Sequence, residues 1–151
     1  NKRLEAFERL FDNPDFEGSI FRKDIRKLLD PFEVKNVKEV NTVYEFIHAI
    51  ASDTKIILNA SSIDLADAET FESNVVNFDY ELEITCVSNI IITCYNDEPS
   101  NILTSDQYVN VLNFSNCENV YINNIVSGHV PRTPGAECDG GVFMFYDCSD
   151  I

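Results

Sequence analysis

The sequence repeats one seven-residue pattern three times. The copies are ITCVSNI at 84–90, FSNCENV at 114–120 and FYDCSDI at 145–151, so the steps between them are 30 and 31 residues. Each copy runs apolar, polar, polar or thiol, small apolar, polar, Asn or Asp, aliphatic. Self-similarity at a fixed period of this size is typical of stacked repeats, in which each unit buries its apolar face against its neighbours. The pattern therefore predicts a stack of similar coils.

Short apolar segments separated by tight polar turns continue from residue 82 onwards, with no helical pattern between them. Strands that repeat in this way pair in parallel, and a coil of strands satisfies that pairing without helices. The Asn or Asp at the sixth position of each copy (Asn89, Asn119, Asp150) is expected to hydrogen-bond the backbone at a sharp corner rather than to catalyse. The residues expected in the interior are Leu82, Ile84, Ile90, Ile92, Val111, Phe114, Val120, Ile122, Val142, Phe143 and Phe145.

A helix and then a strand are predicted ahead of the repeats. The tetrapeptide TVYE at 42–45 fits a capping box, in which the Thr hydroxyl and the Glu carboxylate satisfy free backbone donors. Apolar residues recur at Val43, Phe46, Ile47 and Ile50, which predicts an amphipathic helix over about 42–51. The β-branched run 54–58 predicts the first strand. The helix is expected to cap the coil.

Residues 1–40 are expected to form a charged helical pair and a linker, and residues 41–151 the β region. The loop between the two helices, 13–24, resembles an EF-hand loop, with Asn13, Asp15, Glu17 and Asp24 at the ligand positions 1, 3, 5 and 12. Proline at position 2 and Asp in place of Glu at position 12 depart from that pattern. The alternative is a plain connection whose acids cap the second helix, with no Ca²⁺ or other cofactor.

The net charge of −15 is confined to the β region. Residues 1–40 hold nine basic and nine acidic residues, whereas residues 41–151 hold only Lys55 and Arg132 against 17 acids. Such a surface repels nucleic acid and anionic membranes, both of which are bound through clusters of Lys and Arg. No apolar run approaches the roughly 20 residues needed for membrane insertion. Partners are expected to be neutral, cationic or bridged by a divalent metal ion.

The five cysteines contain no C-x-x-C pair, so a zinc ribbon or a thioredoxin motif is unsupported. Cys117 and Cys148 occupy the same slot of successive copies, at a strand spacing compatible with a disulfide. The alternative is that both are small buried hydrophobes in an interior row. We expect reduced thiols.

Segment 128–141 is the stretch most typical of a functional site. It carries His129, Arg132, Glu137, Cys138 and Asp139 among prolines and glycines, and each of these side chains can bind a metal or exchange a proton. The catalytic candidates are His129, Arg132, Glu137 and Asp139. Cys138 is a poor nucleophile because the acids on either side disfavour its thiolate. The alternative is a packed loop in which His129 hydrogen-bonds the backbone and Gly140-Gly141 permit a tight entry into the next strand.

Two stretches resemble right-handed parallel β-helix proteins of the pectin-lyase-like type. Segment 43–65 has the helix followed by T-x-I-x-L-x-x-x-x-x-x-L, with Ser61-Ser62-Ile63 where relatives place Gly-Thr-Tyr. Segment 110–151 is similar to a bacterial subgroup in NVL-x-F, NV-x-I, GH and G-x-x-C-x-GGV. The resemblance implies a mainly β fold, a parallel β-helix solenoid with an N-terminal capping helix. This scaffold carries lyases, hydrolases, adhesins and inert modules, and a lyase would need a basic Arg or Lys on a coil face together with acids holding Ca²⁺.

The function expected is a non-catalytic binding or structural module that presents an acidic face and the 128–141 loop to a carbohydrate or protein partner. The alternative is a carbohydrate-active enzyme, a polysaccharide hydrolase or lyase, that uses acids near His129. The third copy of the pattern ends where the second continues into Tyr121 and Ile122. We therefore expect the chain to continue, or an end-to-end contact to cover the open final strand.

Overall fold

The computed structural model describes residues 30–130, 132, 133, 135 and 140–151. Within this part the protein is mainly β, with one α-helix, α3 (Val43–Ala49), and one 3₁₀ helix, η1 (Leu65–Asp67). The strands are β1 (Asn36–Val40), β2 (Thr54–Leu58), β3 (Ser62–Asp64), β4 (Phe71–Glu72), β5 (Val76–Phe78), β6 (Leu82–Thr85), β7 (Ser88–Thr93), β8 (Ser100–Thr104), β9 (Leu112–Ser115), β10 (Glu118–Asn123), β11 (Ile125–His129) and β12 (Phe143–Tyr146). The helical pair expected before residue 30 lies outside the described residues.

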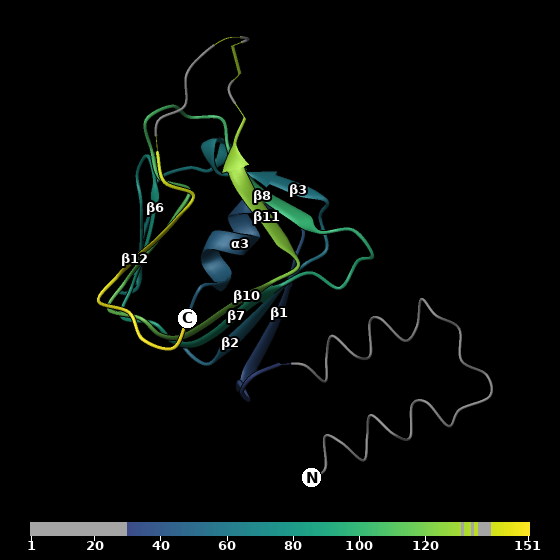
Figure 1. Ribbon diagram of the computed structural model, residues 1–151, viewed down its shortest axis with the longest axis vertical. Helices are drawn as coiled ribbons and strands as arrows, with labels where there is room; N and C mark the ends of the chain where they lie inside the picture. Colours follow the sequence, from purple (N-terminus) through teal and green to yellow (C-terminus); the bar gives the residue numbers. More distant parts are fainter. Residues whose placement is uncertain (1–29, 131, 134, 136–139) are drawn as a thin grey trace, which may run out of the picture.

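The strands form three sheets, which lie around α3 in the view of Figure 1. Sheet A has the order β1-β2-β7-β10, sheet B the order β11-β8-β3 and sheet C the order β12-β9-β6-β5-β4. From β6 to β12 the chain passes through sheets C, A and B in turn and then repeats that order. Every pair in sheets A and B is parallel, as are β6-β9 and β9-β12 in sheet C.

The three copies of the heptapeptide lie beside one another in parallel register. Ile84 pairs with Phe114, and Phe114 pairs with Phe145. One corner further on, Ser88 pairs with Glu118, which in turn forms a parallel bridge with Ser149. The expected stacking of positions 84, 114 and 145 is therefore observed.

The corner between sheets C and A has the same backbone shape in each copy. Two of its positions adopt the left-handed conformation, which Asn and Asp enter more readily than other non-glycine residues. The residues are Cys86, Asn116 and Asp147 at the third position and Asn89, Asn119 and Asp150 at the sixth, all with φ between 51° and 57°.

The sixth-position side chains form a ladder across the coils. Asn119 Nδ2 donates to Asn89 Oδ1 at 2.8 Å, and Asn89 Nδ2 donates to Asp53 Oδ1 at 2.9 Å. Asp53 has a left-handed φ of 54° as well. The structural role expected of this column is observed, but the printed partners are neighbouring side chains rather than the backbone, because identical corners place like amides side by side.

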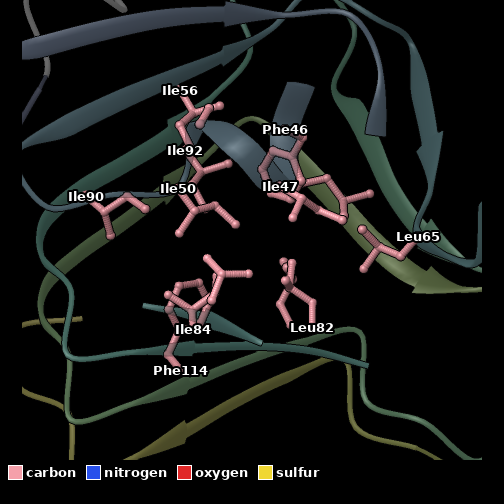
Figure 2. Packing of buried hydrophobic residues seen from close by; sticks show 14 of the residues in the cluster. Phe46, Ile47, Ile50, Ile56, Leu65, Leu82, Ile84, Ile90, Ile92 and Phe114 are labelled. Carbon is pink, nitrogen blue, oxygen red and sulfur yellow. The ribbon is translucent and has the colours of Figure 1, made fainter. Parts of the chain in front are cut away.

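The capping box at the start of α3 is confirmed: Glu45 N donates to Thr42 Oγ1 at 3.1 Å, and Thr42 N donates to Glu45 Oε2 at 3.2 Å. The helix places Phe46, Ile47 and Ile50 in the hydrophobic core, each at most 5% exposed. Figure 2 shows these three side chains between isoleucines of sheet A and the inward residues of sheet C. The helix therefore fills the space that the sheets enclose at the β1-β2 end.

Most of the predicted interior is buried, and the exceptions lie at the opposite end. Leu82, Ile84 and Phe114 are fully buried, whereas Phe143 is 36% and Phe145 37% exposed. Both phenylalanines are on β12, the last strand of sheet C, and no described element covers them. They line a hollow of about 400 Å³ together with Val120, Ile122 and Ile125.

Two features were not predicted. Strand β1 lies inside the expected linker and pairs in parallel with β2, although four of its five residues are exposed and give no apolar pattern. The pairs β4-β5 and β5-β6 are antiparallel, so a short meander extends sheet C beyond the repeating strands.

The described cysteines Cys86, Cys94, Cys117 and Cys148 are all free, as expected. Cys117 Sγ donates to Ile84 O at 3.6 Å, and Cys148 Sγ donates to Phe114 O at 3.5 Å. The two thiols therefore make the same contact one coil apart. Burial raises the pKa of Cys117, which disfavours its thiolate.

Candidate functional site

His129, at the end of β11, is held by the backbone of a neighbouring loop. Its Nε2 lies 2.7 Å from Val109 O, and because a carbonyl oxygen only accepts, Nε2 carries the hydrogen. Gly140 approaches the same carbonyl so closely that an added Cβ would lie 2.0 Å from Val109 O. These contacts are those of the packed-loop alternative for the His129 region.

Arg132 is bound by protein groups on three sides. Its Nη2 lies 2.7 Å from Asp67 Oδ1 and 3.7 Å from Asp64 Oδ2, and its Nε donates to Ser105 Oγ at 2.6 Å. A guanidinium paired in this way ties the segment after β11 to η1. Glu137 and Asp139, the other catalytic candidates, lie outside the described residues, as do Asn13, Asp15, Glu17 and Asp24 of the EF-hand-like loop.

The outer face of sheet C carries a site that the sequence analysis did not single out. Strand alternation turns Leu82 and Ile84 inward, so Glu83 between them faces out. Strand register then sets outward side chains in one row across the sheet, from β4 to β12. The row consists of Glu72, Asn77, Glu83, Asn113 and Met144.

Two adjoining hollows follow this row, and they share Glu81 and Glu83 in their walls. The first, of about 260 Å³, is also lined by Asn113 and Tyr146. The second, of about 280 Å³, includes Asp79 together with the tyrosines at 80 and 108. Among the described residues, neither lining contains a Lys or an Arg. The face is therefore negatively charged and flanked by aromatic rings.

Neighbouring groups fix the two shared carboxylates. Glu83 Oε2 accepts a hydrogen bond from Asn77 Nδ2 at 3.1 Å. Glu81 Oε2 accepts one from the backbone N–H of Asn110 at 2.9 Å, and Asn110 Oδ1 accepts one from Gly141 N at 2.7 Å. The antiparallel meander and the loop before β9 thus orient acids that would otherwise be free on a surface strand.

Asn113 is the unusual residue of the first hollow. It is only 7% exposed although it faces outward, and neither Nδ2 nor Oδ1 of its side chain has a hydrogen-bond partner. Leaving a buried donor or acceptor unpaired costs about 1–3 kcal/mol. Buried amides are almost always satisfied, so this one is built to meet something other than its own protein.

Part of this site was within reach of the sequence. Glu83, Asn113 and Met144 each precede the first residue of a heptapeptide copy, and the repeat alone places them side by side. The contribution of Asn77 follows from the antiparallel meander, which the repeat does not encode. The burial of Asn113 depends on neighbouring strands and has no signal in the sequence.

Comparison of the chain with protein-family models, with curated proteins and with solved structures gave no match. In the described part of the chain, the structure holds no helix with the length and apolar character of a membrane span. The same residues contain no cluster of three or more His, Cys, Asp or Glu side chains arranged to hold a metal ion.

Proposed function

We propose that the chain is the capped N-terminal part of a right-handed parallel β-helix that serves as a non-catalytic carbohydrate-binding module. The regular passage through sheets C, A and B supports the β-helix, as do the parallel registers 30 and 31 residues apart. Crossovers between parallel strands of one sheet are right-handed in about 98% of cases, which supports the hand. The likeness of segments 43–65 and 110–151 to pectin-lyase-like proteins fits the same reading.

The single observation that carries the binding function is the acidic, tyrosine-flanked double hollow on the outer face of sheet C. Carbohydrates offer many hydroxyl donors, for which fixed carboxylates and amides are suitable acceptors, and apolar ring faces that pack on aromatic side chains. Tyr80 is 72%, Tyr108 68% and Tyr146 51% exposed, although large apolar surfaces are usually buried. A rigid sheet holds these groups at fixed spacings.

A non-catalytic role is favoured over an enzyme because the two described catalytic candidates are occupied by their own protein. His129 is bound to Val109 O, and Arg132 is bound to Asp67 and Ser105. A general acid or base needs a free path to the proton that it transfers.

The test is a glycan array followed by titration calorimetry with the full chain, together with product analysis after long incubation. Binding of at least one glycan with no product is the expected result. Failure to bind any glycan at millimolar concentration would refute the proposal. Hydrolysis or β-elimination that His129→Ala or Asp139→Ala abolishes without unfolding would establish a carbohydrate-active enzyme instead.

A further inference from the structure

The structure assigns the Asn113 hollow as a subsite for one uncharged sugar ring, with Asn113 as the residue that recognises two adjacent hydroxyl groups. This inference rests on the proposed carbohydrate-binding function and names the site, the ligand class and the selecting groups. The juxtaposition behind it is a buried, unpartnered amide beside the fixed carboxylates of Glu81 and Glu83, under the exposed ring of Tyr146.

The hydrogen-bonding needs of Asn113 define the chemistry of the ligand. Its Nδ2 is a donor and its Oδ1 an acceptor, and both are unpaired and shielded from solvent. A bare cation would satisfy the oxygen alone and an anion the nitrogen alone. A pair of neighbouring hydroxyls satisfies both, because one accepts from Nδ2 while the other donates to Oδ1.

The carboxylates decide which hydroxylated ligands can enter. Glu81 and Glu83 line the same hollow, where they accept hydrogen bonds from further hydroxyls and repel a ligand carboxylate. Uncharged sugars, and sugars carrying an ammonium group, are therefore favoured over uronates. Lys55 and Arg132, the only basic residues beyond residue 40, are ion-paired elsewhere, to Asp30 and Asp67.

The size of the hollow and its acceptors favour a saccharide over a peptide segment. A volume of about 260 Å³ is below the roughly 300–1,000 Å³ of drug-sized sites and suits a single ring. A peptide backbone brings one N–H per residue, whereas two carboxylates and one amide oxygen here require several donors at one point. The second hollow begins at the same two glutamates, so the next ring of an oligosaccharide would lie toward Tyr80 and Tyr108.

The key variant is Asn113→Leu, which keeps a similar side-chain shape and removes both unpaired polar atoms. Replacing an unsatisfied buried amide by an apolar group of similar shape is neutral or stabilising. We therefore expect the urea midpoint to stay the same or rise while affinity falls about tenfold to a hundredfold, the loss of two hydrogen bonds. An amide that serves only the fold would give the opposite result, a lower midpoint and unchanged affinity.

The matched control is Asn101→Leu, an outward asparagine on β8 in sheet B whose Nδ2 donates to Ser61 O at 3.0 Å. This variant removes a satisfied hydrogen bond far from sheet C in the strand order. It should lower the urea midpoint and leave glycan affinity unchanged.

Binding is measured with cellohexaose and maltohexaose, with the cationic hexamer of glucosamine, and with hexagalacturonate. Native protein should bind a neutral or cationic hexamer at least tenfold more tightly than hexagalacturonate, and Glu83→Gln should narrow that gap. Equal binding of hexagalacturonate, or an Asn113→Leu variant that binds like the native protein, would overturn the subsite while glycan binding itself stands. If none of the hexamers and no array glycan binds, the proposed function fails. If the array reports only protein or peptide ligands, the saccharide assignment is wrong.

Discussion

The ladder of stacked corner residues can be tested by replacing Asn89, its middle member, with alanine. Asn89 accepts a hydrogen bond from Asn119 at 2.8 Å and donates one to Asp53 at 2.9 Å. Each bond contributes about 0.5–1.5 kcal/mol. Its φ of 57° adds about 1 kcal/mol for a residue with a Cβ that lacks the local bonding of Asn. Asn89→Ala should therefore lower the free energy of unfolding by roughly 2–4 kcal/mol, a large part of the usual 5–15 kcal/mol.

Asn89→Gly separates the two contributions, because glycine loses the same bonds but adopts a positive φ freely. The gain is partly offset by the extra freedom of glycine in the unfolded chain, about 0.4–1 kcal/mol. We expect the glycine variant to be about 0.5–1 kcal/mol more stable than the alanine variant. Urea denaturation followed by far-ultraviolet circular dichroism measures both differences.

The matched control is Asn74→Ala, at an exposed asparagine in the loop between β4 and β5. It should change the stability by no more than about 0.5 kcal/mol. The reasoning is refuted if Asn89→Ala also stays within that limit. A double-mutant cycle with Asn119→Ala should give a coupling of about 0.5–1.5 kcal/mol, and a coupling of zero would mean that the two amides do not interact.

Three further variants test the packing. Phe114→Ala removes a fully buried ring and should cost about 3–5 kcal/mol, whereas Phe145→Ala, at a ring 37% exposed, should cost less than half as much; equal losses in urea would contradict the stacking order. Gly140→Ala would place a Cβ 2.0 Å from a backbone oxygen and should cost about 1–3 kcal/mol, while Gly128→Ala meets nothing within 4 Å and serves as its control; a thermal scan that ranks them in reverse would refute this close approach. Burial alone would lower the pKa of Lys55, but its hydrogen bonds to a carboxylate and to a tyrosine raise the pKa above 10.5. The stabilisation from Lys55 is therefore complete below pH 10.5 and is lost as the pH rises through the folded-state pKa, so Lys55→Met should flatten the alkaline loss of stability, and an unchanged alkaline limb would contradict the ion pair.

The repeat was sufficient to predict the stacking of the heptapeptides because equal sequence steps and equal corners impose one register. Thr42 and Glu45 were equally informative, since a capping box depends on four consecutive residues and needs no tertiary context. Strand β1 was missed because its pairing with β2 comes from the edge of an existing sheet and not from its own residues.

The candidate site was harder to predict because burial is not a local property. Asn113 is outward by strand alternation, which the sequence indicates, yet it is shielded by neighbours that three different strands supply. His129 drew attention as a chemically versatile side chain, whereas its partner, Val109 O, is a backbone atom with no sequence signature.

The account depends most directly on the parallel superposition of the three heptapeptides, and nuclear Overhauser effects test it. The rings of Phe114 and Phe145 lie 5.2 Å apart between centroids, and Phe114 pairs with Ile84 on its other side. The Phe114 ring should therefore show cross-peaks both to the Phe145 ring and to the Ile84 methyl groups, which are 31 and 30 residues away in the sequence. Cross-peaks that instead join these segments antiparallel, or that are absent from both pairs in the folded protein, would contradict the account.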